Sequence, residues 1–453
     1  MLKTLLCAAI TIFAFEVSWA GGNCLDTDRV QNEVFSIFTV KSEDSNLKFD
    51  ACDSKNILRK FAQAILFIKD TPAEKIPAEL DLELQDSNPY SYFAARIKTV
   101  VFDSVGESRC GTTTMAYVLS DEENTLHVCP YLNIFDMLTM ASTLIHESRH
   151  IEGYPHSRCQ HGTMAIGGGF ACDKDYHDYR GSYAVGTLFE ARLAISPSSN
   201  PVVKLQARSR AVVSLLERFN KLPLDMKTGA LLQAADGDVY FYDGEQSQVI
   251  MQVPADSILT TRTSLPTFFD SASAQVKSFV YGLGFVETAG EYAQSFRSNY
   301  SAQDRTELVD VSYSGDYSCL LFKTKIICGA DADPDKELSL GDIQPRQFLS
   351  TSNSVMVQKD ILYIATAEGD LYPLPMYWKD FQKMKNSDLK KSLTVQNLVS
   401  LGPLPGQGEI AVTLTGKALI LSNRSWMAPL GLPQVPFRKV FAPYYWSKKL
   451  ETF

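Results

Sequence analysis

Residues 146–156 read HESRHIEGYPH, and this stretch decides how the N-terminal half of the chain is interpreted. On an α-helix, His146 and His150 are separated by about 400° of rotation, so both imidazoles leave one face, about 6 Å apart along the axis. Two nitrogens placed in this way can share one Zn²⁺. Glu147 lies about 100° around the helix from His146, beside the metal, where it can deprotonate a bound water. The pattern predicts a zinc-binding helix that carries a general base.

The residues after His150 predict that the helix stops and the chain turns back. Gly153 readily adopts a positive φ, which terminates helices. Pro155 has no amide hydrogen to donate, and it disfavours helical geometry at the residue before it. His156 can therefore return to the metal as a third ligand, which leaves the fourth position of a tetrahedral site open for water. We expect one zinc ion per chain, held by the three histidines.

This spacing resembles the signature of the metzincin clan of zinc endopeptidases, H-E-x-x-H-x-x-G-x-x-H. Its five fixed positions are matched by His146, Glu147, His150, Gly153 and His156. The resemblance implies hydrolysis of peptide bonds, with Glu147 as general base and the histidines as zinc ligands. It also implies an upstream edge strand that pairs with substrate backbone, placed at Leu126–Tyr131, and a methionine turn beneath the zinc, placed at Met164. Arg149 stands where metzincins usually have glycine, so the resemblance is to an outlying family.

Other polar residues near the motif offer alternative roles. His161 is an alternative third ligand, and Glu190 is the alternative for the downstream carboxylate ligand that other zincins use. Tyr176, Tyr179 and Tyr183 follow the motif, and Tyr183 is the candidate donor to the oxyanion of a tetrahedral intermediate. Packing against the motif helix is the competing and more common role of such aromatic residues.

The first twenty residues have the pattern of a secretory signal peptide. Lys3 supplies the positive start, residues 4–15 form an apolar stretch, and Ser18-Trp19-Ala20 places small residues where a signal peptidase cleaves. The apolar stretch is shorter than the ~20 residues that span a bilayer. We therefore expect export to a periplasm or to the extracellular space, with no integral membrane span.

Cleavage after Ala20 would leave eight cysteines, an even number that suits an oxidising compartment. They fall into near neighbours along the chain, and sequential pairing keeps every loop short. The predicted disulfides are Cys24–Cys52, Cys110–Cys129, Cys159–Cys172 and Cys319–Cys328. Eight cysteines allow on the order of 100 connectivities, so other pairings stay open at this point.

Residues 21–220 alternate helical and extended patterns, which predicts an α+β zincin-like domain. Asn133 is the expected cap of the motif helix. The predicted helices are Asn56–Lys69, Asn133–Glu152, Ser182–Ile195 and Val202–Phe219. The predicted strands are Thr112–Leu119 and Thr125–Tyr131.

Residues 221–453 predict an all-β domain. Turns that pair glycine with aspartate recur at Asp236-Gly237, Gly315-Asp316 and Gly369-Asp370. Extended runs centre near residues 240, 280, 320, 363 and 415, a spacing of roughly 40 to 45 residues that is typical of four-stranded blades. The spacing favours a β-propeller, interrupted by a helix at 378–391, while a sandwich or another β fold stays open.

The formal net charge of -9 provides no basic stripe and argues against a nucleic-acid-binding protein. Together, these features predict a secreted zinc endopeptidase whose β domain binds a protein or cell-surface partner. One alternative is an exported binding protein with a structural zinc site. The other is a zinc hydrolase of non-peptide bonds. An intact Glu147 favours an enzyme, because a structural site gains nothing from a base.

Overall fold

The structure is a computed structural model, and its described residues fall into two compact units. The N-terminal unit comprises the described residues up to Leu224, and the propeller unit runs from Asp225 to Glu451. The described residues are 24–451 without 72–74, 83–87, 105–108, 111–113, 162–169, 255–256, 260–264, 271–274, 288–303, 305, 314–316, 330–334, 351–361, 376, 395–396, 405, 407 and 423–424. The expected signal peptide and Met164 lie outside them.

A four-stranded sheet forms one layer of the N-terminal unit. Its strands in chain order are β1 (Thr39–Ser42), β2 (Thr99–Phe102), β3 (Ala116–Val118) and β4 (Thr125–Val128). Their order across the sheet is β1-β2-β4-β3; β1, β2 and β4 are parallel, and β3 is antiparallel to β4. The prediction of Leu126–Tyr131 as an edge strand is therefore wrong. That strand ends at Val128 and is flanked on both sides, because β3 folds back along it and becomes the edge.

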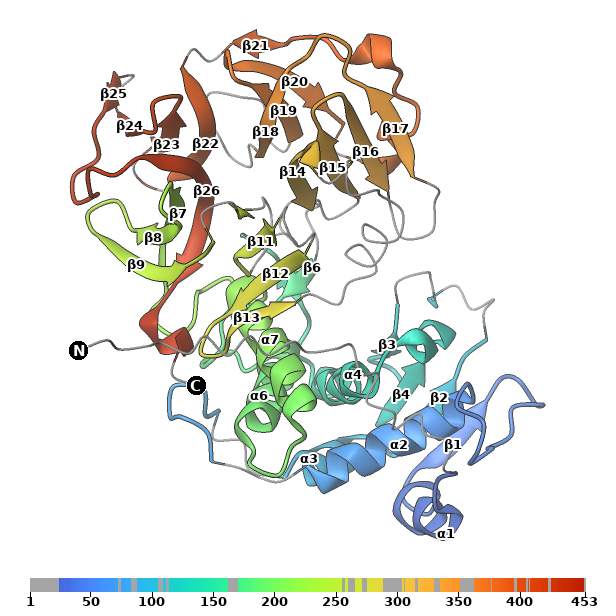
Figure 1. Cartoon of the computed structure of the whole chain (residues 1–453). Coiled ribbons are helices and arrows are strands. Elements are labelled where there is room, and N and C mark those ends of the chain that lie inside the picture. The colour runs from blue at the N-terminus through green and yellow to red at the C-terminus, as the bar shows by residue number, and fades with distance from the viewer. Residues whose placement is uncertain are drawn as a thin grey trace, which may run out of the picture. The chain divides into compact units, whose positions relative to one another are not determined.

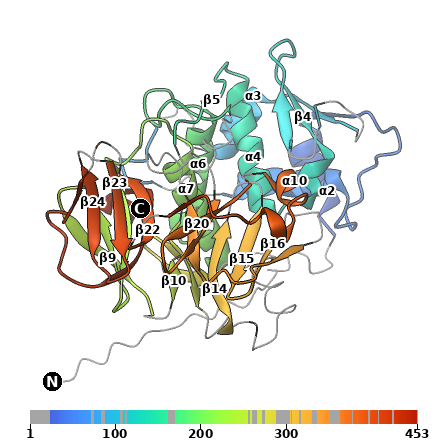
Figure 2. The same cartoon turned by 90° about the horizontal axis from the view of Figure 1, so that it is seen from above.

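Helices cover this sheet and form the hydrophobic core with it. The core gathers buried aliphatic side chains around aromatic ones that include Phe38, Phe61 and Phe93. The longer helices are α2 (Ile57–Asp70), α3 (Pro89–Arg96), α4 (Met137–His150), α6 (Ser182–Ile195) and α7 (Pro201–Glu217). Figures 1 and 2 show α4 between the sheet on one side and α6 with α7 on the other. The motif helix is thus supported by packing on both sides.

The start of α4 differs from the prediction. The helix begins at Met137, where the side chain of Asp136 accepts a hydrogen bond from the amide of Thr139. Asn133 does not cap it, because its amide side chain donates to the Lys55 carbonyl at 2.9 Å. Residues Pro130–Ile134 instead form a separate 3-10 turn that starts with the proline.

All four sequential disulfides are present in the structure. Three lie in the N-terminal unit, at Cys24–Cys52, Cys110–Cys129 and Cys159–Cys172. The fourth, Cys319–Cys328, joins two paired strands of the propeller unit. The predicted pairing is confirmed, and four disulfides indicate an oxidising, exported environment.

Five four-stranded antiparallel sheets make up the described part of the propeller unit. Figure 1 shows them arranged around a common centre, as in a β-propeller. The structure thus confirms a propeller-like arrangement of four-stranded sheets, and it does not support the sandwich alternative. The first sheet combines β7 (Lys227–Ala234), β8 (Asp238–Tyr242) and β9 (Ser247–Gln252) with β26 (Phe437–Trp446). The strand β26 pairs antiparallel with β7 and so joins the end of the unit to its beginning.

The other four sheets follow the order of the chain. Their strands are β10 (Ile258–Leu259), β11 (Thr267–Asp270), β12 (Gln275–Val280), β13 (Gly284–Glu287), β14 (Leu308–Tyr313), β15 (Ser318–Phe322), β16 (Lys325–Gly329), β17 (Lys336–Ser339), β18 (Pro345–Ser350), β19 (Leu362–Thr366), β20 (Asp370–Leu374), β21 (Leu393–Thr394), β22 (Leu398–Leu404), β23 (Gly408–Thr413), β24 (Ala418–Ser422) and β25 (Ser425–Met427). Hydrogen bonds also join neighbouring sheets, for example between the Gln233 side chain and the backbone of Ser257 and Leu259.

Two of the three predicted glycine turns are present, and the third, Gly315-Asp316, lies outside the described residues. Gly237 and Gly369 have φ of 97° and 84°, which glycine adopts without the steric penalty of a side chain. The expected helix at 378–391 is only a short helix, α10 (Trp378–Phe381), followed by a 3-10 turn at Asn386–Asp388. Trp378 and Phe381 pack with Tyr317 in the core between two sheets, so this insertion is buried at its start.

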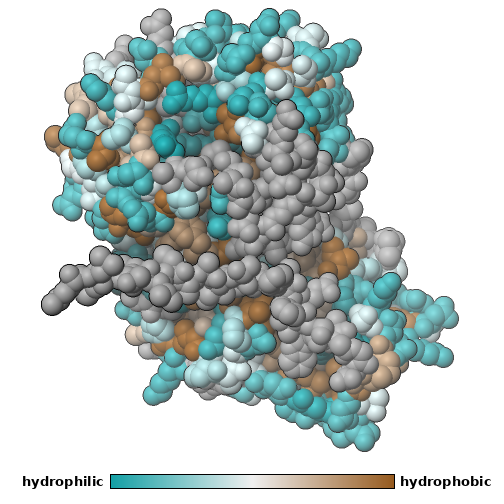
Figure 3. All heavy atoms as spheres, viewed as in Figure 1, coloured by the Kyte–Doolittle hydropathy of each residue, from teal (hydrophilic) through white to brown (hydrophobic). Residues whose placement is uncertain are grey.

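The surface of the propeller unit in Figure 3 is mostly hydrophilic, with hydrophobic residues scattered between polar ones. Among the described residues, no helix is long and apolar enough to cross a membrane.

Candidate metal centre

The end of α4 turns as its sequence predicts. The helix ends at His150, and the amide of Gly153 donates to the His150 carbonyl at 2.9 Å. Gly153 has φ of +80°, and a Cβ built there would meet nothing within 4 Å. Glycine is therefore favoured by the backbone conformation and not by lack of space. The turn brings His156 back toward the helix.

Three imidazoles converge after this turn. The Nε2 atom of His156 lies 3.1 Å from Nε2 of His146 and 3.2 Å from Nε2 of His150. One ring nitrogen of each histidine lies within 4.8 Å of the others, and no further described His, Cys, Asp or Glu belongs to this group. Three nitrogens that meet at one point, with no fourth protein ligand among the described residues, fit an open zinc site.

Backbone contacts orient two of the three rings. Nδ1 of His150 lies 2.7 Å from the Tyr154 carbonyl, which can only accept, so this nitrogen carries the proton. His146 has a hydrogen bond with the backbone of Ser182. Burial and the neighbouring imidazoles lower the pKa of His150 to about 4 and that of His146 well below its ordinary value. These two rings are therefore neutral near pH 7, which is the form that binds a metal.

Glu147 is buried beside the histidines, with 9% of its surface exposed. Burial raises the pKa of its carboxyl group to about 8. Its negative charge also contributes to the raised pKa of Tyr183, after burial and the charge of Asp173. Burial favours the neutral form of this carboxyl group, and a cation bound at the three imidazoles would stabilise its charged form, so Glu147 is compatible with a metal ion at this place.

Tyr183 is the one tyrosine of the three candidates that contacts the cluster. Its ring centroid lies 4.6 Å from that of His146 and 4.7 Å from that of His156. The guanidinium carbon of Arg218 lies over the Tyr183 ring, 4.7 Å from its centroid. Burial raises the pKa of Tyr183, and the positive charge of Arg218 opposes that rise. The phenol therefore stays protonated at neutral pH and can act as a donor.

The other two tyrosines have structural roles. The hydroxyl of Tyr176 donates to the Leu80 carbonyl at 2.8 Å and its side chain is buried. The hydroxyl of Tyr179 donates to the Pro155 carbonyl at 2.6 Å and so supports the turn before His156.

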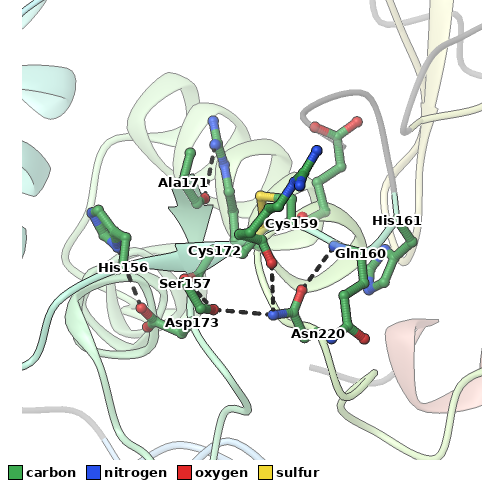
Figure 4. Close-up of a disulfide and its surroundings, with 12 residues drawn as sticks. His156, Ser157, Cys159, Gln160, His161, Ala171, Cys172, Asp173 and Asn220 are labelled. Atoms are coloured by element: carbon green, nitrogen blue, oxygen red, sulfur yellow. Dashed lines mark hydrogen bonds and ion pairs between the residues drawn. A yellow bond between two sulfur atoms is a disulfide. The ribbon is translucent and has the colours of Figure 1, made fainter. Parts of the chain in front are cut away.

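The alternative ligands lie elsewhere. Nε2 of His161 contacts the Phe219 carbonyl at 2.6 Å, and Figure 4 shows it separated from His156 by the Cys159–Cys172 disulfide. The Glu190 carboxylate accepts hydrogen bonds from Ser142 and from Arg210, both at 2.7 Å. Neither side chain joins the group of three histidines.

Asp173 and Arg218 are the site residues that sequence reasoning missed. Oδ1 of Asp173 lies 3.5 Å from Nδ1 of His156, as drawn in Figure 4. Nothing in the local sequence distinguishes either residue from an ordinary surface charge. The one available signal was the Cys159–Cys172 bridge, which draws the residue after Cys172 toward the segment that carries His156.

A second cluster that resembles a metal site has a different explanation. Asp103, Cys110 and Cys129 lie close together, but the two cysteines form a disulfide and offer no thiolate. His127 lies between two carboxylates, with Nδ1 3.0 Å from Asp103 and Nε2 3.0 Å from Glu122. Both ring nitrogens are occupied by these contacts.

No protein-family profile and no curated protein matches this sequence. Solved structures with some likeness include the N-terminal domain of Nup159, at 11% identity and a TM-score of 0.19, covering 46% of this chain and 52% of that one. PorZ, a surface component of the type-IX secretion system of Porphyromonas gingivalis, has 10% identity, a TM-score of 0.21 and coverage of 46% and 26%. AztD from Citrobacter koseri has 9% identity, a TM-score of 0.24 and coverage of 47% and 88%. The chain thus spans about half of the first structure and about a quarter of the second, and such TM-scores carry no argument about function.

Proposed function

We propose that this protein is an exported zinc-dependent endopeptidase of metzincin-like type. His146, His150 and His156 hold the metal in this proposal, and Glu147 is the general base. The observation that carries it is the convergence of three Nε2 atoms, with separations of 3.1 and 3.2 Å from His156, next to a buried glutamate. A hydrolytic zinc site needs three protein ligands, one open position and a base, and the three histidines and Glu147 are residues of the required types.

A zinc ion bound here would acidify a water molecule and polarise the scissile carbonyl. The chain's own residues perform the remaining steps. Glu147 holds the attacking water, takes its proton and later gives that proton to the leaving amine. Tyr183 offers its hydroxyl to the carbonyl oxygen as negative charge develops there, because its ring contacts both His146 and His156.

The corrected edge strand fits a role in substrate binding. β3 forms one of the two edges of the sheet, opposite β1, and contacts α4. The residue before it, Met115, accepts a hydrogen bond from the Thr143 hydroxyl of α4 at 3.8 Å. An edge strand has unpaired backbone groups that an extended peptide can join by strand addition. We propose that the substrate backbone pairs with residues 116–118 and not with 126–131.

The five-sheet propeller favours a second candidate, an exported binding protein with a structural metal site. Propellers present loops and strand ends around a centre, and such a surface suits a protein partner. Against this candidate stands the composition of the metal group, since structural zinc sites are usually closed by a fourth protein ligand. The described residues bring only three together.

A Glu147→Gln variant separates the two candidates. We expect purified wild type to contain one zinc and to digest casein or a peptide library. The variant should lose about 10²- to 10⁴-fold in rate, because a general base contributes that much. Its zinc content should remain that of wild type. Glu123→Gln, at an exposed glutamate of the same unit, is the matched control and should keep full activity. A zinc-loaded wild type that cleaves nothing, with Glu147→Gln identical in every assay, would rule out the peptidase and leave the binding protein.

A further inference from the structure

Asp173 is held rigidly at the end of β6 (Phe170–Cys172). Its amide donates to the Arg218 carbonyl at 2.8 Å, and its carbonyl accepts from the amide of Asn220 at 3.0 Å. The preceding residue, Cys172, is bonded to Cys159. The backbone of Asp173 is therefore fixed on both sides, and its side chain has 0% exposure.

One carboxylate oxygen of Asp173 is bound to a helix. Oδ2 accepts a hydrogen bond from the amide of Ala184 at 3.1 Å, in the first turn of α6. The N-cap residue of α6 is Gly181, which has no side chain to fill this role. A Cβ on Gly181 would lie 2.5 Å from the Asp173 carboxylate, so glycine leaves the space that the carboxylate occupies. Asp173 thus caps α6 from another segment, where the helix dipole favours a negative charge.

The other carboxylate oxygen of Asp173 faces the histidine cluster. Oδ1 lies 3.5 Å from Nδ1 of His156, and both atoms are buried with no hydrogen-bond partner among the described residues. A buried polar atom without a partner destabilises the folded protein, and here an acceptor oxygen and a ring nitrogen that can carry a proton face each other. A proton on Nδ1 satisfies both, and a shift of a few tenths of an ångström completes the hydrogen bond.

We propose that Asp173 is the positioning residue for His156. Its Oδ1 accepts the Nδ1 proton, fixes the ring orientation and leaves the lone pair of Nε2 directed to the point where the three imidazoles meet. The inference rests on the proposed metal site. His150 is oriented by the Tyr154 carbonyl and the Ser182 hydroxyl, and His146 by the backbone of Ser182, all of them uncharged groups. Asp173 differs from these partners because it brings a carboxylate to the Nδ1 atom of His156. Such partners of metal-bound histidines set tautomer and basicity.

Replacement by asparagine distinguishes positioning from capping. In Asp173→Asn the amide oxygen still accepts the Ala184 hydrogen bond, so the cap of α6 is kept. The amide nitrogen then faces His156 and donates to Nδ1, which moves the imidazole proton to Nε2. That tautomer has no lone pair at the metal position. A residue that only caps the helix would leave the tautomer and the metal affinity of the site unchanged.

The test measures zinc affinity and the tautomer in the same set of proteins. Chelator competition on the full chain should show binding weakened about 10- to 100-fold in Asp173→Asn. Long-range nitrogen-proton NMR of the metal-free protein should show His156 changing from the Nδ1-protonated to the Nε2-protonated form. Asp175→Asn is the matched control, because Oδ1 of Asp175 also accepts two backbone amides, at 2.5 and 2.9 Å, in a turn nearby. It should bind zinc as wild type does.

The outcomes separate this inference from the proposed function. Tight zinc binding and an unchanged His156 tautomer in Asp173→Asn would overturn the inference and leave the peptidase proposal standing. A wild type that binds no zinc would overturn the proposed function, while the tautomer in the metal-free proteins would still decide the role of Asp173. If Asp173→Asn does not fold, Gly181→Ala tests the same contact, since the added methyl displaces the carboxylate and should also weaken zinc binding.

Discussion

Buried carboxylates occur in both units of the chain, and their surroundings differ. In the propeller unit, Asp310 on β14 is completely buried and accepts a hydrogen bond from Lys439 Nζ on β26 at 2.7 Å. The amides of Phe348 and Val311 donate to the same carboxylate at 2.8 and 2.9 Å. Burial raises the pKa of Asp310, and these partners oppose the rise. The charge is balanced inside the chain and joins strands of different sheets.

The N-terminal unit leaves its buried carboxylates without such a partner at the histidine cluster. Glu147 has only burial acting on its pKa, and Asp173 directs one oxygen to an imidazole. In the proposed function, a divalent cation held by the three imidazoles would balance these two carboxylates. The comparison shows that a buried carboxylate paired within the chain depends on its partner, whereas one without an internal cation is a candidate position for a bound ligand.

Removing the internal cation of the propeller should have the largest effect on stability. Lys439→Met leaves Asp310 buried and unpaired, which typically costs about 3 to 5 kcal/mol. Urea unfolding of the full chain should show the midpoint of the propeller transition falling accordingly. Lys449→Met is the matched control, because Lys449 pairs with Asp225 at 2.7 Å on the surface, and its midpoint should stay near that of wild type. Equal midpoints for both variants would contradict the idea that Asp310 depends on Lys439.

Adding zinc should stabilise the N-terminal unit alone. At a free zinc concentration of 100 times the dissociation constant, one site contributes about 2.7 kcal/mol to the free energy of unfolding. Calorimetry of the chelator-treated protein should show one transition moving upward with zinc and the propeller transition staying in place. His156→Ala removes one of the three nitrogens and should abolish the shift. A zinc-dependent shift of the propeller transition would show that the contrast between the units is wrong.

His127 is an intermediate case, because its imidazole contacts the carboxylates of Asp103 and Glu122 and carries a positive charge only when it is protonated. Burial opposes its protonation, but hydrogen bonds with Asp103 and Glu122 raise its pKa overall above the ordinary 6.5. The charged contacts then contribute stability below pH 6.5, and this contribution is lost as the pH rises through the pKa of the folded state.

His127→Gln should therefore be less stable than wild type by about 1 kcal/mol in mildly acidic solution, the usual size of such a contribution. The difference should shrink as the pH rises, and urea unfolding over a pH series measures it. A difference that grows toward alkaline pH has the wrong sign and would exclude this account of His127.

Local features of the fold were predictable from the sequence, and the order of strands was not. α6 has the predicted bounds, and Asn56 caps α2 through the Arg59 amide. These elements depend on residues three or four positions apart. The edge strand was misplaced because the order β1-β2-β4-β3 depends on pairings between distant segments. The five sheets were predictable because the repeat of turns and extended runs recurs along the chain.

The same distinction applies to the candidate site. The three histidines and Glu147 lie within one helix and one turn, so their spacing alone predicted that they would meet. Asp173 comes from a short strand held by a disulfide, and Arg218 from the residue that ends α7. Their positions depend on how α6, α7 and β6 pack, which no local pattern specifies.

The pairing of β26 with β7 has a consequence for how the protein is made. About 200 residues separate the two strands, so the first sheet of the ring has three strands until nearly all of the propeller has been synthesised. Until β26 arrives, β7 exposes an unpaired edge that invites association with other chains. The ring therefore closes late, after synthesis of its final strand, and loss of that strand would leave an open, aggregation-prone arc in place of a closed propeller.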